Sequence, residues 1–504
     1  MQRVPANRAR HDRGSTGRAP LRRPGGVGAS DSRNVQVGVG AEHPLVDSRD
    51  NDRLHRYEDA VKHSFDQIKP VLKQLSALQH DRDFEHKAQD IARREFGFEL
   101  PTDILADAWV CQLDMKKLFA WCVFETYRRY CDDFYRLEPL AAQGADDFAA
   151  FLQGCGFHTL DMTPCADGRL AHVIRYVLRL PQDQVRRKSY AGATFDVEDS
   201  IQKWVEVEML RYREGRPNLA DAPTRYLKAV VYHYSSVDPE HQGCAAHGSD
   251  TALAASEGLK RLEAFREAIE NSYCCGASID LLLIGLDTDT DAIRVHVPDG
   301  EGNTELNSYV DNLALFDETA RLGGSEAAAT IDRTVAAAAG GTAPGMQRFI
   351  AQLLTNNLSQ IAYVRAFHGA SYADIGHAER FIGAGVGFEE VQLRNLMYFA
   401  YLQTVEEGAK DMDVGVKIFS GLNASHGLPI PVVIRFDYHG QVPGARERAT
   451  ERCRQVAKAV KTRYGKLFER GLLHILQVVR DCTDTAPIEV VCCSVRKNEF
   501  AGAH

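Results

Sequence analysis

The chain of 504 residues is 44% hydrophobic, 26% charged and 9% aromatic, with a net charge of −9. This composition is that of an ordinary globular protein of about three domains, and it excludes collagen-like, coiled-coil and wholly disordered chains. Apolar stretches such as residues 281–285 are too short to span a membrane, and twelve cysteines are too few for a disulfide-stapled secreted scaffold. We therefore expect a reducing, cytoplasmic compartment and no membrane partner.

Residues 1–50 are rich in Arg, Gly, Pro and Ser and poor in core-forming side chains. Such a segment buries too little apolar surface to offset the entropy of ordering, so we expect a disordered basic tail. Residues 1–40 alone hold eight arginines and two aspartates, which gives +6 and leaves −15 for the rest of the chain. Because nucleic-acid binding normally needs a cationic face, the acidic remainder predicts no nucleic-acid partner.

A helical domain is expected over residues 51–140, because apolar side chains recur there every three or four positions. One stripe consists of Val61, Phe65, Ile68, Leu72 and Leu75, and a second consists of Leu105, Ala108, Trp109 and Leu113. This spacing places each stripe on one face of a helix, and we expect both stripes to be buried.

From about residue 141 the pattern changes to short apolar strands separated by helices. Residues 229–232 and 279–284 are expected to form buried strands, with a helix over 251–271 between them. The Ala- and Gly-rich stretch 323–345 is expected to be a loop or a poorly packed helix. Strand, helix, strand is typical of a sheet covered by helices, so we expect a mixed α/β domain over residues 141–388.

The last part of the chain, residues 389–504, repeats this arrangement. Strands are expected over 432–436 and 488–492, with a helix over 446–472 between them. In this alignment Ile279 matches Ile488, and His233 of the first unit becomes Arg435 of the second. We therefore expect a degenerate copy of the preceding domain.

Residues that carry chemistry follow two of the expected strands. The segment Cys165-Ala-Asp167-Gly-Arg169 follows a strand-like stretch, and its glycine allows a sharp turn at the edge of a sheet. His233 ends the next strand, and Cys244 precedes a Gly/Ala-rich entry into a helix. Each residue alone is more often structural, but two cysteines and a histidine with an open fourth position are a known form of catalytic zinc site. Together they predict a metal centre.

These motifs resemble the beta-class carbonic anhydrases and, in particular, their divergent branch, the carboxysome shell carbonic anhydrases. The likeness rests on Cys165-x-Asp167-x-Arg169, on the spacing of eleven between His233 and Cys244, on the leading helical domain and on the trailing repeat. It covers the chain beyond the tail. The resemblance implies one zinc ion per chain, held by Cys165, His233 and Cys244, a C-terminal copy without zinc, and a homodimer.

The resemblance also implies a reaction, in which a zinc-bound hydroxide attacks carbon dioxide to give bicarbonate. Asp167 would accept a hydrogen bond from the hydroxide, and Arg169 would keep Asp167 ionised. The enzyme would supply carbon dioxide to Rubisco inside a carboxysome, with the tail docking to Rubisco or a shell protein. Two thiolates make zinc a weaker acid than three histidines do, so activity should rise toward alkaline pH. His368 and His377 are candidate proton relays, although their spacing does not distinguish them from surface histidines.

Several alternatives stay open in the sequence. His241 satisfies the His-x-x-Cys spacing of ordinary beta-class enzymes with Cys244, but His233 closes a strand, and we favour His233. Asp167 could bind zinc directly in a resting form. His247 as a fourth ligand would leave no position for water. The non-enzymatic alternative is a scaffold or shell-associated protein with a structural zinc.

Overall fold

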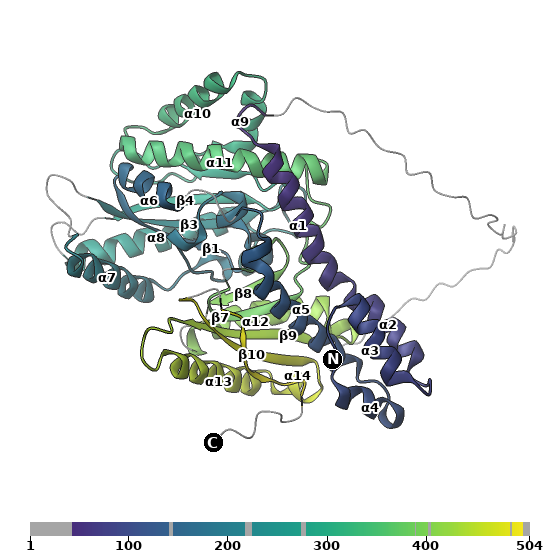
Figure 1. The fold of residues 1–504 in the computed structure, drawn as a ribbon. Coiled ribbons are helices and arrows are strands. Elements are labelled where there is room, and N and C mark those ends of the chain that lie inside the picture. Colours follow the sequence, from purple (N-terminus) through teal and green to yellow (C-terminus); the bar gives the residue numbers. More distant parts are fainter. Residues whose placement is uncertain are drawn as a thin grey trace, which may run out of the picture. The chain divides into compact units, whose positions relative to one another are not determined.

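The structure is a computed structural model, and the residues that it describes are 43–140, 145–216, 224–273, 279–388, 390–401, 405–483 and 486–496. Most of the predicted basic tail, residues 1–42, lies outside them. The described chain consists of an N-terminal helical region followed by two sheets with their covering helices (Figure 1). The predicted mixed α/β fold is therefore confirmed. In the described ranges, every helix is too short or too polar to cross a membrane.

The N-terminal region is helical, as its apolar periodicity predicts. It contains α1 (Ser48–Asp66), α2 (Ile68–Leu78), α3 (Phe84–Glu95), α4 (Thr102–Cys111) and α5 (Met115–Leu137). The side chain of Asp47 caps α1, and His43 is buried with its Nε2 3.0 Å from Thr319 Oγ1. Residues 43–50 therefore belong to the folded part of the chain, and the prediction of a disordered tail is wrong for them.

Seven of the nine stripe residues are buried as predicted, whereas Val61 is half-buried and Trp109 is 68% exposed. Ile104, Leu105 and Ala108 mark the buried face of α4. At about 100° per residue, Trp109 falls at the edge of this face and turns toward solvent. The three-and-four spacing alone does not locate the centre of the buried face.

The first sheet has six strands in the order β2-β1-β3-β4-β5-β6. They are β1 (Phe157–Pro164), β2 (Val185–Arg187), β3 (Arg225–Tyr234), β4 (Ile279–Asp287), β5 (Ile293–His296) and β6 (Val310–Asp311). The first four are parallel, and β5 and β6 pair antiparallel. β3 and β4 are buried along nearly their whole length, which is typical of parallel strands that are covered on both faces.

Helices cover this sheet and extend from it. α8 (Thr251–Tyr273) packs against β3 and β4, α6 (Ala145–Gly154) packs against β1, and α7 (Val197–Arg213) packs against α8. α9 (Asn312–Thr319), α10 (Gly324–Ala338) and α11 (Pro344–His368) follow β6. The Ala-rich stretch forms the regular helix α10 rather than a loop, because its apolar side chains Ala327, Ile331 and Val335 recur at helical spacing and are buried.

The second sheet has the order β11-β10-β9-β7-β8 and repeats the topology of β5-β4-β3-β1-β2. Its strands are β7 (Phe381–Val386), β8 (Met397–Tyr401), β9 (Ile430–Tyr438), β10 (Leu473–Asp481) and β11 (Glu489–Cys493). In both sheets four strands are parallel and the next is antiparallel. α12 (Val405–Leu422), α13 (Ala445–Arg463) and the short α14 (Gly465–Glu469) complete this region, and α5 packs against β9 and β10.

Three details of the predicted repeat need correction. β10, not the strand after Ile488, takes the place of β4, because β10 pairs parallel with β9 while β11 is antiparallel. The apolar run 472–479 directly follows helices, and periodicity alone does not separate a short buried strand from a helix end. β7 belongs to the second sheet but precedes the expected boundary at 388/389.

The third detail concerns the residue that matches His233. The β3–β4 ladder ends at the pair Tyr234–Asp287, and the β9–β10 ladder ends at Tyr438–Asp481. When the two ladders are superposed at these end pairs, Asp437 of β9, rather than Arg435, takes the position that His233 has in β3. The match of His233 with Arg435 is therefore shifted by two residues. Because side chains alternate between the two faces of a strand, Arg435 lies on the same face as the true counterpart but at a different position.

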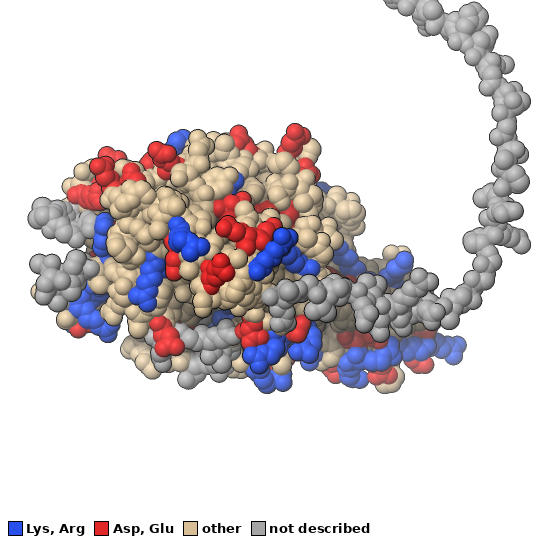
Figure 2. Space-filling view, turned by 90° about the horizontal axis from the view of Figure 1, so that it is seen from above, with Lys and Arg blue, Asp and Glu red and all other residues tan. Residues whose placement is uncertain are grey.

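Charged side chains of both signs lie side by side on the face of the molecule in Figure 2. Several of the ion pairs at the surface join neighbours on one helix, such as Lys203–Glu206 on α7 and Lys260–Glu257 on α8. Pairs of this kind keep the surface solvated and contribute little to stability.

Candidate metal centre

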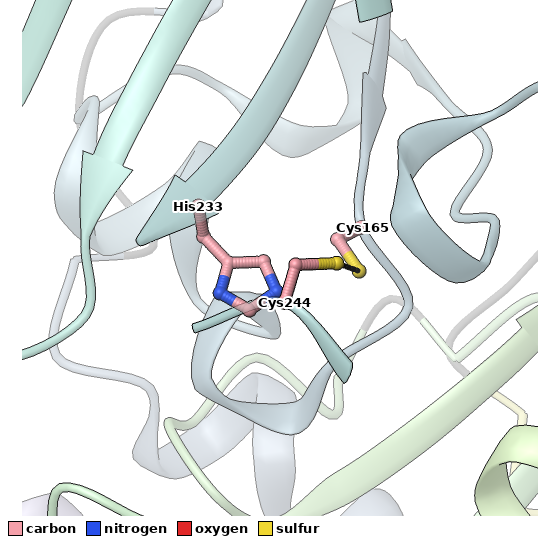
Figure 3. Close-up of side chains that lie close together, drawn as sticks. All are labelled: Cys165, His233 and Cys244. Carbon is pink, nitrogen blue, oxygen red and sulfur yellow. Dashed lines mark hydrogen bonds between the residues drawn. The ribbon is translucent and has the colours of Figure 1, made fainter. Parts of the chain in front are cut away.

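Three metal-ligand side chains meet at the carboxyl ends of β1 and β3 (Figure 3). Cys165 directly follows β1, His233 is the penultimate residue of β3, and Cys244 precedes the short 3-10 helix Ala245–His247. Their ligand atoms all lie within 4.8 Å of one another, and the two sulfurs are 3.9 Å apart. The order of the sheet reverses between β1 and β3, which is where open α/β sheets form ligand sites.

The His233 imidazole is buried and has no hydrogen-bond partner on either ring nitrogen among the described residues. Asp167 Oδ2 lies 3.5 Å from Nε2, outside hydrogen-bonding geometry. A buried polar group without a partner costs free energy, and a ligand such as a metal ion is one of the few explanations for it. Two sulfurs beside an orphaned imidazole nitrogen fit a thiophilic metal.

The two thiols of the cluster differ in acidity. The hydrogen bond between them, together with burial, raises the pKa of Cys165. The same bond lowers the pKa of Cys244, although burial opposes it, with help from the backbone N–H groups of Ala246 and His247. The Gly192 N–H also donates to Cys165 Sγ at 3.2 Å. These donors suit sulfur atoms that carry negative charge.

The two other candidate histidines of this loop lie outside the cluster. His241 is exposed, and its Nδ1 is 2.9 Å from Asp238 Oδ1. The Nε2 of His247 lies 3.1 Å from the Gly192 carbonyl oxygen. Gly192 has a φ of +68°, and a Cβ there would overlap the His247 ring, so a glycine is needed at this close approach. The geometry thus brings His233, and neither of the others, to the two cysteines.

Asp167 and Arg169 form a buried, doubly hydrogen-bonded pair beside the cluster. Arg169 Nε donates to Asp167 Oδ1 at 3.0 Å, and Nη2 donates to Oδ2 at 2.7 Å. The guanidinium also donates to the carbonyl oxygens of Gln242, Gly243 and Ile375. Arg169 therefore connects the turn after β1 to the loop that carries Cys244, and this connection positions Asp167.

A second cluster joins Asp167 to His377 and Glu379, whose ligand atoms also lie within 4.8 Å of one another. His377 Nε2 is 3.8 Å from Asp167 Oδ2, and Nδ1 is 3.0 Å from Glu379 Oε1. Burial alone would raise the pKa of Asp167, but Arg169, His377 and His233 together hold it well below the usual value. Burial would lower the pKa of His377, yet Asp167 and Glu379 raise it to about 9. His368 belongs to neither cluster.

Sequence reasoning did not single out Glu379, and it left His377 undistinguished from surface histidines. Both approach Asp167 from more than 200 residues downstream, and only the fold brings them there. A weak signal exists in retrospect, because both precede the strand-like run 381–386 and so belong to a connection between sheets. Such connections often contribute functional residues.

The second sheet also contacts the backbone of the turn that carries Asp167. The Phe399 N–H donates to the Ala166 carbonyl at 3.1 Å, and the Asn395 N–H donates to the Gly168 carbonyl at 2.8 Å. Glu379 Oε1 accepts from the Gly168 N–H at 3.1 Å. The turn therefore lies between the two sheets and depends on both.

Three sequence models of one family match the chain from residue 43 to residue 495. The N-terminal, catalytic and C-terminal domains of Carboxysome Shell Carbonic Anhydrase match residues 43–135, 147–377 and 378–495. The chain belongs to this family. The resemblance in the sequence is thereby confirmed, and the metal-ligand cluster lies within the region that matches the catalytic domain.

Relatives from three bacteria cover nearly the whole chain, and each is called carboxysome shell carbonic anhydrase. The protein of Prochlorococcus marinus (strain MIT 9313) is 56% identical over 483 residues, covering 94% of this chain and 94% of the relative. That of Parasynechococcus marenigrum (strain WH8102) is 54% identical over 487 residues, covering 96% and 83%. That of Halothiobacillus neapolitanus (strain ATCC 23641 / c2) is 46% identical over 461 residues, covering 89% and 90%.

Proposed function

We propose that this chain is a zinc carbonic anhydrase that interconverts carbon dioxide and bicarbonate inside the carboxysome. Family membership supports a carbonic anhydrase role in that compartment. The observation that carries the zinc assignment is the buried cluster of Cys165, Cys244 and the orphaned imidazole of His233. Zinc prefers such sulfur and nitrogen ligands, and three of them leave one tetrahedral position for solvent. A zinc ion there would lower the pKa of a bound water, although two thiolates make this effect weaker than in a three-histidine site, so the fraction of hydroxide should rise toward alkaline pH.

Asp167 is the group that orients the attacking oxygen in this proposal. Its Oδ1 accepts from the Arg169 backbone N–H and Nε, whereas Oδ2 accepts from Nη2 and also faces His233 and His377. The lowered pKa keeps the carboxylate ionised, so that Oδ2 can accept one more hydrogen bond from a hydroxyl group in the site. Arg169 positions both carboxylate oxygens through its planar guanidinium.

His377 is the proposed route by which a proton leaves the site. Its Nε2 lies next to Asp167, and its side chain is 19% exposed, whereas Asp167 and Arg169 are buried. Among these groups, the imidazole is therefore the one that can exchange a proton with solvent or buffer. General acid–base groups of this kind need contact with both the site and the exterior.

The partners of the proposed enzyme follow from the family and from the charge of the tail. We propose a homodimer that supplies carbon dioxide to Rubisco, with residues 1–42 docking to Rubisco or to a shell protein. Because residues 43–50 pack into the folded region, the shortened protein that tests docking should keep them and start at residue 43. Deleting 1–42 should abolish encapsulation while carbon dioxide hydration persists, and packaging at the wild-type level would refute the docking role.

Zinc analysis together with a carbon dioxide hydration assay tests the function. Wild type should hold about one zinc ion per chain and hydrate carbon dioxide, and Cys165→Ala should lose both the metal and the activity. Cys453→Ala is the matched control, because Cys453 is equally buried but lies in α13, away from the cluster. It should retain both. A wild-type chain that holds zinc without hydrating carbon dioxide would exclude the enzymatic proposal.

The alternative of a scaffold with a structural zinc makes a different prediction. A structural site is closed by a fourth protein ligand, but the described residues place only three ligand atoms in this cluster. Asp167→Ala separates the two functions, since the catalytic proposal expects retained zinc and an activity loss of at least about 100-fold. A scaffold has no activity to lose, and loss of zinc from Asp167→Ala would instead favour Asp167 as a ligand.

A further inference from the structure

Glu379 lies at the junction between the two sheets, two residues before β7, and its side chain is completely buried. Its Oε1 accepts two hydrogen bonds, from the Gly168 N–H at 3.1 Å and from His377 Nδ1 at 3.0 Å. One oxygen atom thus holds both the backbone of the Asp167 turn and the imidazole beside it. No other described residue contacts both groups through hydrogen bonds.

The bond from Glu379 determines how the His377 ring is used. A carboxylate oxygen accepts hydrogen bonds, so Nδ1 must carry the proton that it donates to Oε1. The other nitrogen, Nε2, then points toward Asp167 Oδ2 at 3.8 Å. Without this bond the imidazole would be free to adopt other rotamers, because its side chain is partly exposed. Glu379 therefore fixes the orientation of His377 and, when the ring is neutral, keeps the remaining proton on Nδ1.

Gly168 and Glu379 fit each other closely. A Cβ at residue 168 would overlap Glu379 Cγ, so the carboxylate can reach the backbone N–H only because residue 168 is a glycine. The second oxygen, Oε2, is buried and has no hydrogen-bond partner among the described residues. A buried carboxylate with one unsatisfied oxygen is a poor choice for stability alone, which favours a role in the site.

We propose that Glu379 is a positioning residue, which orients His377 toward Asp167 and holds the Asp167–Arg169 turn against the second sheet. The inference rests on the proposed carbonic anhydrase function. It assigns a role to the region of the second sheet, in which Phe399 of β8 and Asn395, two residues before β8, bind the same turn through their backbone N–H groups. The C-terminal region thus completes the geometry of a site whose proposed metal ligands all lie in the other region.

The test compares Glu379→Ala with Glu379→Gln in the full-length, zinc-loaded protein. Alanine removes both hydrogen bonds, and kcat should fall about ten-fold, the usual effect of losing a residue that orients a site group. The glutamine amide oxygen can accept the same two bonds, so kcat should stay within about three-fold of wild type. Zinc content should remain at the wild-type level in both variants, because neither contacts Cys165, His233 or Cys244.

A double-mutant cycle with His377→Ala tests whether Glu379 acts through the imidazole. In the His377→Ala background, Glu379→Ala should lower kcat by less than about three-fold, because the orienting contact is already absent. Glu138→Ala is the matched control, since Glu138 is also a buried carboxylate that accepts a backbone N–H but lies away from the site. It should lower the melting temperature without changing kcat.

Each remaining outcome overturns the inference. Unchanged kcat in Glu379→Ala would show that Glu379 has no positioning role. An equal fall of kcat in the Ala and Gln variants would show that the negative charge of Glu379, rather than its hydrogen bonds, is what matters. Full additivity in the cycle would show that Glu379 does not act through His377, and zinc loss would make it a support of the metal. If wild type itself hydrates no carbon dioxide, the proposed function fails and the inference falls with it. An active wild type with an unimpaired Glu379→Ala overturns the inference alone.

Discussion

Replacing Arg169 by leucine should damage both stability and catalysis. Arg169 is fully buried and donates two hydrogen bonds to Asp167 and three to backbone carbonyl oxygens. Leucine occupies part of the same volume but donates none of these bonds. The Asp167 carboxylate would then lie in a buried site without its guanidinium, and the carbonyl oxygens would lose their donor.

The expected loss of stability follows from these contacts. Removing one partner of a buried ion pair costs about 3–5 kcal/mol, and orphaned carbonyl oxygens add to this. Asp167 relieves part of the cost by taking up a proton, because burial raises its pKa once Arg169 no longer opposes it. We therefore expect a net loss of about 4 kcal/mol at pH 7. For a folded unit of roughly 460 residues the unfolding entropy is about 1 kcal/mol/K, so the melting temperature should fall by about 4 °C.

The loss should depend on pH with a defined sign. In wild type the pKa of Asp167 is lowered, so its stabilisation is fully present above the unfolded value of 3.8 and is lost only as pH falls through the lower folded value. In Arg169→Leu burial raises the pKa of Asp167 instead, so the penalty for its buried charge is relieved as pH falls through that raised value toward 3.8. The difference between wild type and Arg169→Leu should therefore be largest near pH 7 and should narrow toward pH 4. Thermal melts across this range measure it directly.

Arg179→Leu is the control for loss of a guanidinium without loss of an ion pair. Arg179 is half-buried and hydrogen-bonds to the neutral side chains of Asn51 and Gln360. Its removal should cost about 1 kcal/mol, or about 1 °C, with no change between pH 7 and pH 4. Equal losses in the two variants, or an Arg169→Leu deficit that does not narrow in acid, would refute the ion-pair reasoning. Carbon dioxide hydration should be lost in Arg169→Leu alone.

Three further predictions concern other parts of the chain. Because the pKa of His377 is raised, protonated His377 stabilises the fold fully below pH 6.5, its unfolded value, and this stabilisation is lost as pH rises through about 9. The melting temperature of His377→Gln should therefore vary less than that of wild type between pH 6.5 and pH 9. Trp109→Ser should leave the melting temperature within about 1 °C, since Trp109 is exposed; a larger fall would place it in an interface. Gly385→Ala should destabilise the second sheet by at least about 2 kcal/mol, because its φ is +131° and a Cβ would overlap a carbonyl oxygen of β9. Gly421→Ala, on an open position of α12, should be neutral or slightly stabilising in the same thermal melts.

The part of the candidate site that depends on local structure could be predicted from the sequence. Cys165, Asp167 and Arg169 lie within one turn after a strand, and His233 closes the neighbouring parallel strand. Since parallel strands end at the same edge of a sheet, strand prediction alone places these side chains near one another. The loop that returns Cys244 to the same edge contains no regular pattern, so its place depended on the chemistry of the residue type and on the family resemblance.

Contacts between distant segments could not be predicted in this way. Glu379 approaches Gly168 across 211 residues of sequence, and no periodicity links the two positions. β10 was missed because a helix precedes it and its apolar run resembles a helix end. Trp109 was placed in the core because the spacing of apolar residues gives a helix face but not its centre. These features depend on packing between elements, which a single sequence specifies only through the folded chain.

The two sheets share a topology but differ in the charged groups that they bury. In the second sheet, Arg435 is buried and pairs with Glu390 Oε2 at 2.7 Å and with Asp437 Oδ1 at 2.6 Å. Arg480 also pairs with Glu390. Because a guanidinium is a permanent cation, two cations balance the two carboxylates without a bound metal ion or thiolate ligands. The second sheet can therefore keep its fold while Phe399 of its edge strand β8, together with Glu379 and Asn395 just before β7 and β8, holds the turn after β1. In the proposed function the metal ligands all come from the first of the two regions, so the second region needs its topology to hold the turn but does not need the same side-chain chemistry.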